Sequence, residues 1–132
     1  MASAGGHWIQ LLRLQPAWAG CELAFLSTDE SVGSMLDPTV RFHAVAEASR
    51  WEKFKLLKSA LQVGLVLIRE RPDVVITTGA AVGYFAIVFG RLLGSRTIWI
   101  DSIANAEEIS MSGRKAAKFA HVFLTQWPDL ER

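Results

Sequence analysis

Residues 71–94 read RPDVVITTGAAVGYFAIVFGRLLG, and this stretch holds the signals for a strand, a tight turn and a helix in succession. The β-branched run Val74–Thr77 favours a strand, and Gly79 marks the turn that ends it. A helix is expected from about Val82 to Leu93. The uncharged part of the stretch, 74–90, approaches the length of a membrane span. Because its internal glycines separate different elements, we favour strand, turn and helix over a transmembrane helix.

Strands and helices alternate on both sides of this stretch. We expect helices from the glycine turn at 4–6 to 14, at 51–71 and at 114–120, strands at 22–27, 40–45, 96–101 and 121–125, and polar loops at 29–38 and 103–113. This alternation predicts an α/β, Rossmann-like parallel sheet with helices on both faces, in a single domain that spans 1–132.

The sequence before the first glycine turn is short for this architecture. A strand at the centre of the sheet normally leads into that turn, yet only Met1 and Ala2 precede Ser3. Without a central strand, its two neighbours would lack backbone partners. We therefore expect that the first strand is truncated or that the start is misplaced.

Composition excludes several classes of protein. The chain has 132 residues, with 14 Lys and Arg against 13 Asp and Glu, and this near-neutral balance argues against a nucleic-acid binder. Apolar residues make up 51% before glycine is counted, which indicates that some apolar surface faces a partner or a membrane. Cys21 is the only cysteine, so the chain forms neither an internal disulfide framework nor a cysteine-based zinc site, and a reducing, cytoplasmic setting fits. The N-terminus does not resemble a signal peptide.

The first glycine turn, Ser3-Ala4-Gly5-Gly6-His7, is a candidate phosphate site. Its glycines allow close approach of the backbone to an anion, and the following helix points its unpaired N–H groups at the same place. His7 would donate to a phosphate oxygen or take a proton from a sugar hydroxyl. Alternatively, the glycines form only a tight turn that His7 caps, and the motif alone leaves both interpretations open.

The second glycine turn repeats this device after the strand 74–77. Its candidate residues are Thr78, Gly79, Ala80, Gly83 and Tyr84. Since parallel strands end at one edge of a sheet, the two turns together are suited to a diphosphate, one phosphate at each helix N-terminus. Close packing of the helix on the sheet also favours small residues, and Tyr84 then serves only for packing.

The segment after the strand at 96–101 supplies polar groups at the same edge. Asp101, Ser102, Asn105, Glu107 and Glu108 are candidates for holding a sugar or activating a hydroxyl. The alternative is structural: Ser102 or Asn105 caps a turn, and the two glutamates are simply solvated.

The long helix carries a polar stripe of its own. Trp51, Lys55, Lys58 and Gln62 fall on one helical face, with Arg50 just before it. A cationic stripe with a tryptophan is suited to anionic lipid headgroups or a partner, although a solvated helix face explains it as well. His43 and His121 lack companions at metal-ligand spacing, and we interpret them as structural.

Five motifs occur together in this sequence: SAGGHW at 3–8, SRW at 49–51, KFKLL at 53–57, RERPDVVITTG at 69–79 and WIDSIAN at 99–105. Taken together they resemble the asparagine-linked-glycosylation protein fourteen family, and the resemblance covers nearly the whole chain. That family includes bacterial subunits of capsular and exopolysaccharide glycosyltransferases, and it is similar to the N-terminal half of the enzyme that adds N-acetylglucosamine to peptidoglycan lipid intermediates.

The resemblance implies one half of a GT-B glycosyltransferase, whose other half is a separate, donor-binding catalytic subunit. On that model the chain presents a polyprenyl-diphosphate-linked sugar acceptor, and the partner holds the UDP-sugar, for example UDP-N-acetylglucosamine, UDP-glucuronate or a UDP-hexose. No metal or other cofactor is implied. The glycine loops would meet the acceptor diphosphate, and His7 or a loop carboxylate such as Glu107 would act as the general base. Asp101, Asn105 and Glu107 would border the cleft.

The resemblance also implies a place in the cell. Eukaryotic members carry an N-terminal membrane anchor that this sequence lacks, so attachment is expected to be peripheral, at the cytoplasmic face of a bacterial inner membrane, through the helix that begins near Trp51. Two other hypotheses stay open. One is a scaffold that only recruits the catalytic subunit. The other is an independent dinucleotide-binding oxidoreductase domain, for which the glycine three positions after Gly6 is missing.

Overall fold

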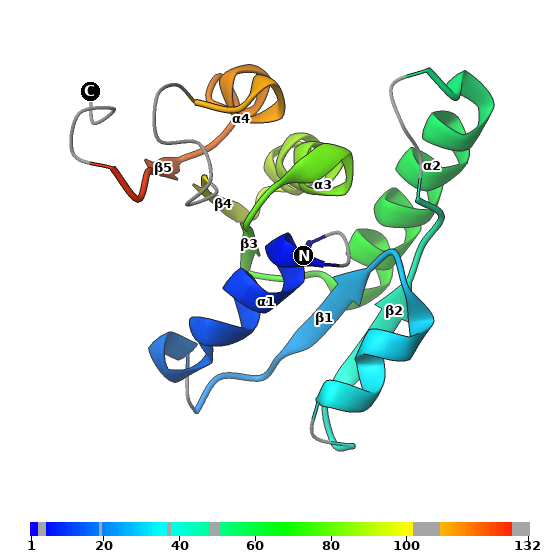
Figure 1. The fold of residues 1–132 in the computed structure, drawn as a ribbon, viewed down its shortest axis with the longest axis vertical. Coiled ribbons are helices and arrows are strands. Elements are labelled where there is room, and N and C mark those ends of the chain that lie inside the picture. Colours follow the sequence, from blue (N-terminus) through cyan, green and yellow to red (C-terminus); the bar gives the residue numbers. More distant parts are fainter. Residues whose placement is uncertain (3–4, 19, 37, 48–50, 102–108, 128–132) are drawn as a thin grey trace.

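A computed structural model describes residues 1–2, 5–18, 20–36, 38–47, 51–101 and 109–127 (Figure 1). It confirms the α/β, Rossmann-like class, with parallel strands joined through helices. The α-helices are α1 (Gly6–Arg13), α2 (Lys53–Glu70), α3 (Ala80–Leu92) and α4 (Met111–Ala116), and the 3₁₀ helices are η1 (Gln15–Trp18) and η2 (Glu30–Met35). The strands are β1 (Ala24–Ser27), β2 (Arg41–Ala44), β3 (Val74–Thr77), β4 (Arg96–Ile100) and β5 (Val122–Leu124).

The strands form two parallel ladders, β1–β2 and β3–β4–β5, and the N-terminal residues lie between them. The amide of Ala2 donates to the carbonyl of Leu26 in β1 at 3.1 Å. The amino group of Met1 donates to the carbonyl of Ile76 in β3 at 2.5 Å, and Ala2 forms a parallel bridge with Gly79. Met1 and Ala2 therefore occupy the central place at which sequence analysis expects the first strand.

Helices cover both faces of this arrangement, as predicted. Side chains alternate along each strand, so Phe25 packs on one face with Trp8 of α1, while its neighbour Leu26 packs on the other with Leu67 of α2. The 3₁₀ helix η2 covers the first face together with α1. On the second face, α2 and α3 pack on the sheet, and α4 joins α3 through Ala116, which packs against Ile87 and Trp99 (Figure 1).

Several element boundaries differ from the sequence-based expectation. The segment 103–113 was expected to be loop throughout, but α4 begins at Met111 because the side chain of Ser110 accepts the amide of Gly113 and caps the helix. That helix ends at Ala116 and does not reach 120. The polar segment 29–38 contains η2, whose N-cap Asp29 accepts the amide of Ser31. Caps of this kind depend on one polar side chain, and they set helix boundaries that hydrophobic periodicity does not predict.

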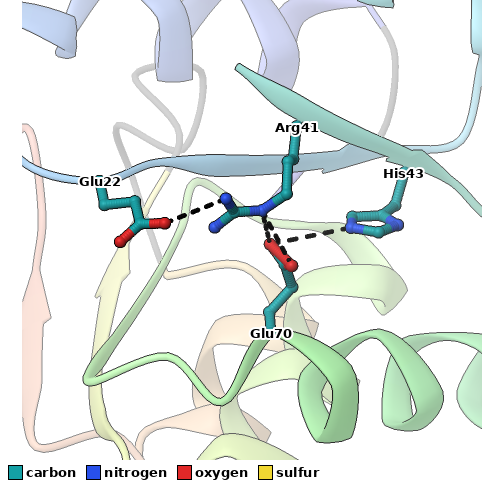
Figure 2. Close-up of polar contacts among 4 residues, drawn as sticks. All are labelled: Glu22, Arg41, His43 and Glu70. Carbon is teal, nitrogen blue, oxygen red and sulfur yellow. Dashed lines mark hydrogen bonds and ion pairs between the residues drawn. The ribbon is translucent and has the colours of Figure 1, made fainter. Parts of the chain in front are cut away.

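A charged cluster ties α2 to the β1–β2 ladder at the amino-terminal edge of the strands (Figure 2). Arg41 donates through Nε to both carboxylate oxygens of Glu70, the last residue of α2, at 3.0 and 2.8 Å, and through Nη1 to Glu22 at 3.1 Å. These hydrogen bonds, with Glu70 as the main cause, raise the pKa of Arg41. His43 lies beside Glu70, with its Nε2 at 3.9 Å from the carboxylate. The cluster lies at the opposite end of the sheet from the glycine turns.

Candidate functional site

The two glycine turns bring two helix N-termini to the carboxyl edge of the sheet. Gly5 precedes α1 with a φ of 86°, and Gly79 precedes α3 with a φ of 138°. Both backbone conformations favour glycine, which lacks the Cβ that would clash there. Among the described residues, no side chain caps the N-terminus of either helix. The N–H groups of both first turns are thus directed to the sheet edge without competition from a capping side chain, as anion sites at helix N-termini require.

The turns are joined by a reciprocal pair of hydrogen bonds between His7 and Thr78. The hydroxyl of Thr78 donates to the carbonyl of His7 at 2.6 Å, and Nδ1 of His7 lies 3.1 Å from the carbonyl oxygen of Thr78. The His7 ring also lies against Gly79, since a Cβ built on Gly79 would come within 2.8 Å of Cε1 and Nδ1. Residues 71 positions apart in the sequence therefore form one unit, and Gly79 is the residue that makes room for the imidazole.

This contact fixes the tautomer of the neutral His7 ring. A carbonyl oxygen only accepts hydrogen bonds, so Nδ1 carries the hydrogen and Nε2 keeps its lone pair. The ring is half-buried, and its orientation is set by Thr78. In the part of the chain that the structure describes, Nε2 has no hydrogen-bond partner, and an oriented imidazole with an available acceptor nitrogen has the form required of a general base.

Two candidates of the second turn have packing roles in the structure. Gly83 is buried, and a Cβ at this position would come within 2.3 Å of the hydroxyl oxygen of Thr77, so Gly83 allows α3 to lie close to β3. Tyr84 packs against the cluster formed by Ile87 and Trp99. Thr78 is fully buried, and it contacts His7 through its hydroxyl and through its backbone carbonyl.

Asp101 does not border a cleft with its carboxylate, because its side chain is 1% exposed. One carboxylate oxygen accepts from the indole of Trp99 at 3.1 Å and from the hydroxyl of Ser110 at 2.7 Å, and the other accepts the amide of Ser110 at 3.1 Å. Asp101 therefore positions the start of α4 relative to the end of β4. The predicted direct contact with a sugar is replaced by this positioning role.

Gln10, which the sequence analysis did not single out, contacts the end of β4. Its side-chain amide donates to the backbone carbonyl of Asp101 at 3.1 Å, which links α1 to the end of β4. The spacing of three residues from His7 places both on one face of α1, and this spacing was the available signal.

The other candidates are divided between the surface of α2 and the undescribed segments. Trp51, Lys55 and Lys58 are exposed, and Lys55 pairs with the carboxylate of Glu52 at 2.8 Å. Gln62 has a structural role, because its side-chain oxygen accepts a hydrogen bond from the amide of Ala46 at 2.7 Å. The remaining candidates, Ser3, Arg50, Ser102, Asn105, Glu107 and Glu108, lie outside the described residues.

The described part of the chain lacks two other features. No helix in it combines the length and the hydropathy that crossing a membrane requires. Within the same residues, no group of three or more His, Cys, Asp and Glu side chains is arranged to hold a metal ion. His121, interpreted above as structural, accepts the amide of Thr97 at Nδ1, at 3.0 Å.

The structure is similar to two solved structures. MurG of Acinetobacter baumannii matches all of this chain and 41% of its own, with a TM-score of 0.75 and 18% identity. The UDP-GlcNAc 2-epimerase of Methanocaldococcus jannaschii matches 93% of this chain and 37% of its own, with a TM-score of 0.64 and 12% identity. At these identities the likeness shows a shared fold, the GT-B-type Rossmann-like half.

Sequence comparison identifies the family. The chain is 30% identical over 135 residues to the UDP-N-acetylglucosamine transferase subunit ALG14 of Eremothecium gossypii, a match of 98% of this chain and 50% of the relative. The corresponding subunit of Schizosaccharomyces pombe is 34% identical over 64 residues, which cover 45% of this chain and 30% of the relative. The chain thus spans half or less of the length of these curated relatives. Residues 27–132 match the model of the family described as "Oligosaccharide biosynthesis protein Alg14 like", and the chain belongs to this family.

Proposed function

We propose that this chain is the acceptor-side subunit of a UDP-sugar-dependent glycosyltransferase. The observation that carries the proposal is the joining of two uncapped helix N-termini through His7 and Thr78 at one edge of the sheet. This arrangement offers two adjacent anion sites with an oriented imidazole beside them. A diphosphate-linked sugar has the matching chemistry, two phosphates next to a reacting hydroxyl.

In the proposed reaction, backbone N–H groups bind the acceptor and His7 transfers its proton. The backbone N–H groups at the starts of α1 and α3 bind one phosphate each and hold the acceptor in place. Nε2 of His7 takes the proton of the acceptor hydroxyl as its oxygen attacks the anomeric carbon of the donor sugar. The bond from that carbon to the UDP oxygen breaks, and UDP leaves with the bonding electrons. Gly79 and Thr78 maintain the ring in position for this step.

The finer features of the proposal concern the partner and the carrier. We propose that the acceptor is linked to a polyprenyl diphosphate and that a separate subunit binds the donor and completes the active site. UDP-N-acetylglucosamine is the first donor to test, because the fungal relatives carry this sugar in their names. The proposed place of action is the cytoplasmic face of a membrane, in oligosaccharide or surface-polysaccharide synthesis.

Reconstitution tests this function. The chain is combined with a donor-binding subunit from the same genome, a prenyl-diphosphate-linked sugar and UDP-N-acetylglucosamine, and sugar transfer is measured with each chain alone and with both. We expect transfer only with both chains. The variant His7→Asn retains a side-chain donor for the Thr78 carbonyl but lacks a base, and kcat should fall by about 10²- to 10⁴-fold while the two chains still form a complex.

The same experiment separates the subunit from a scaffold that touches no substrate. A scaffold predicts that His7→Asn transfers sugar at the parent rate as long as the complex forms. Absence of any transfer with a stable two-chain complex, across the UDP-sugars tested, would contradict the proposed function.

A further inference from the structure

Ser27, the last residue of β1, carries a buried hydroxyl group without a hydrogen-bond partner. The residue is 0% exposed. Among the described residues, no group forms a hydrogen bond with its Oγ. A buried hydroxyl without a partner lowers the stability of a fold, because it has given up its hydrogen bonds to water and gained none. Such a group in a native chain calls for an explanation, and a polar ligand is one of the possible explanations.

Two other buried hydroxyl groups show what a structural role requires. Ser95 is 4% exposed, and its hydroxyl donates to the carbonyl of Pro72 at 2.6 Å. Thr97 is 0% exposed, and its hydroxyl donates to the carbonyl of Phe119 at 3.0 Å. Each of these hydroxyl groups links two segments of the chain. In the part of the chain that the structure describes, the hydroxyl of Ser27 forms no such link.

The side chain of Ser27 lies on the face of the sheet that α1 covers, at the level where this helix begins. Phe25, two residues earlier in β1, points to the same face, and its ring packs edge-on against Trp8 in the first turn of α1, with 5.7 Å between centroids. Helix α1 begins at the carboxyl edge of the sheet and runs back along β1 (Figure 1). The step of about 7 Å from Phe25 to Ser27 is therefore also a step from Trp8 toward the start of the helix.

The first glycine turn leaves room for a ligand at this level. A Cβ built on Gly5 or on Gly6 would meet no described atom within 4 Å, so open space lies beside both residues. The positive φ of Gly5 favours glycine for conformational reasons. Gly6 does not have a positive φ, and no described side chain packs against it. Close approach of a ligand to the backbone is a reason for glycine at Gly6 that remains when packing and conformation supply none.

We propose that the hydroxyl of Ser27 donates a hydrogen bond to an oxygen of the phosphate that binds at the start of α1. This proposal rests on the proposed function and deepens it, because it adds one side-chain donor to the backbone N–H groups of the helix. Hydrogen bonds to a charged oxygen are stronger than those between neutral groups. Since Ser27 is closed off from solvent, the phosphate has to settle between the glycine turn and the end of β1. Gly5 and Gly6 permit this adjustment, because glycine has the widest range of backbone conformations.

The test measures ligand binding and stability of the full chain for the variant Ser27→Ala. Titration calorimetry gives the Kd of a sugar linked through diphosphate to a short prenyl chain, and circular dichroism follows thermal unfolding without this ligand. We expect the Kd to rise at least about tenfold, because a hydrogen bond to a charged oxygen is lost. The midpoint of thermal unfolding should rise by about 2–5 °C, because the variant no longer buries an unpaired hydroxyl.

Ser95→Ala is the matched control, because Ser95 is a buried serine whose hydroxyl already has a partner, at the amino-terminal edge of the sheet. Its unfolding midpoint should fall by about 2–5 °C, and its Kd should equal that of the parent chain.

Two results would overturn the role of Ser27 alone. One is a Ser27→Ala variant that binds the ligand as tightly as a parent chain that does bind it. The other is a fall in the unfolding midpoint of Ser27→Ala that matches the fall in Ser95→Ala, since the hydroxyl would then have a structural role, for example through a buried water. If the parent chain itself does not bind the ligand, the proposed function fails, and the role of Ser27 fails with it.

Discussion

His7 and Gly79 form a coupled pair, because the ring of one occupies the space that a side chain on the other would need. Gly79 has a φ of 138° and a ψ of −167°, a region of backbone space that is essentially restricted to glycine. The backbone conformation of Gly79 would be strained in any residue other than glycine, and the His7 ring lies in close contact with Gly79. Both features place the imidazole beside two helix N-termini.

Replacement of Gly79 by alanine should therefore harm activity and stability together. The new Cβ would lie 2.8 Å from the His7 ring, and the backbone would be strained, so we expect a loss of about 1–3 kcal/mol in the free energy of unfolding and a large loss of sugar transfer. Urea unfolding and the two-chain assay measure the two effects. Gly94→Ala is the control: its φ is also positive, at 89°, but nothing lies within 4 Å of its Cβ, so it should lose about 1 kcal/mol and keep transfer activity. Equal losses of transfer in both variants would refute the coupling.

In a chain prepared with Met1 as its first residue, the amino group of Met1 makes the free energy of unfolding depend on pH. Burial lowers its pKa from 8.0 to about 5, so between these values the unfolded chain binds a proton that the folded chain does not. The free energy of unfolding therefore decreases by up to about 4 kcal/mol as the pH falls from 8 to 5. Above pH 8 the amine is neutral in both states, and the chain keeps its full stability.

N-terminal acetylation isolates this effect, since it removes the titrating amine while the N–H that faces Ile76 remains. Urea unfolding of the acetylated and free chains from pH 5 to 8 should give a shallower pH slope for the acetylated chain. Identical slopes would show that the amine titrates normally in the folded chain.

At the scale of elements, a buried carboxylate links the end of β4 to the start of α4. Asp101 accepts from Trp99 and from both the amide and the hydroxyl of Ser110, and Ser110 in turn caps α4 through the amide of Gly113. The side-chain amide of Gln10 in α1 donates a hydrogen bond to the backbone carbonyl of Asp101. The carboxylate thereby sets how α4 and the site-bearing α1 lie relative to the end of β4.

Asp101→Asn should destabilise the fold by about 1–3 kcal/mol, because one of the donors on Ser110 or Trp99 would then face an NH₂ group in a buried place. Ser110→Ala removes the cap and should cost about 1–2 kcal/mol. Asp73 is exposed, and Asp73→Asn should stay within about 0.5 kcal/mol of the parent. Chemical denaturation of the three variants is the measurement. An Asp101→Asn variant as stable as Asp73→Asn would contradict the positioning role.

Elements were predicted well where a long periodic signal exists and less well where a single polar side chain sets the boundary. The strand 74–77 and the long helix were recognisable from β-branched runs and apolar spacing. The start of α4 depends on Ser110, whose capping role no periodic pattern announces. The residues Trp51, Lys55 and Lys58 are exposed, as a surface stripe requires. Which apolar side chains of α2 are exposed, such as Phe54 and Leu61, depends on which face of the helix the sheet covers, and the sequence alone does not specify that face.

At the scale of the whole molecule, the strands run in the order β2, β1, the N-terminal residues, β3, β4 and β5. The direction of the strand order reverses between β1 and β3, at the N-terminal residues. Rossmann-like sheets bind their ligands at such a reversal. The alternation of elements predicted this sheet, and the two glycine turns lie together at one edge of it, as expected for parallel strands. The bond between His7 and Thr78 was beyond sequence reasoning, because it joins residues that only the folded sheet brings together.

The most direct test of the central claim is an NMR titration of the backbone amides of this chain. A sugar linked through diphosphate to a short prenyl chain is added to one sample and UDP-N-acetylglucosamine to another. We expect saturable shifts for the amides at the starts of α1 and α3, such as Gly6 and Ala81, with the prenyl-linked sugar and none there with the UDP-sugar. Shifts at these amides with the UDP-sugar alone, or none with the prenyl-linked sugar, would contradict an acceptor-side role.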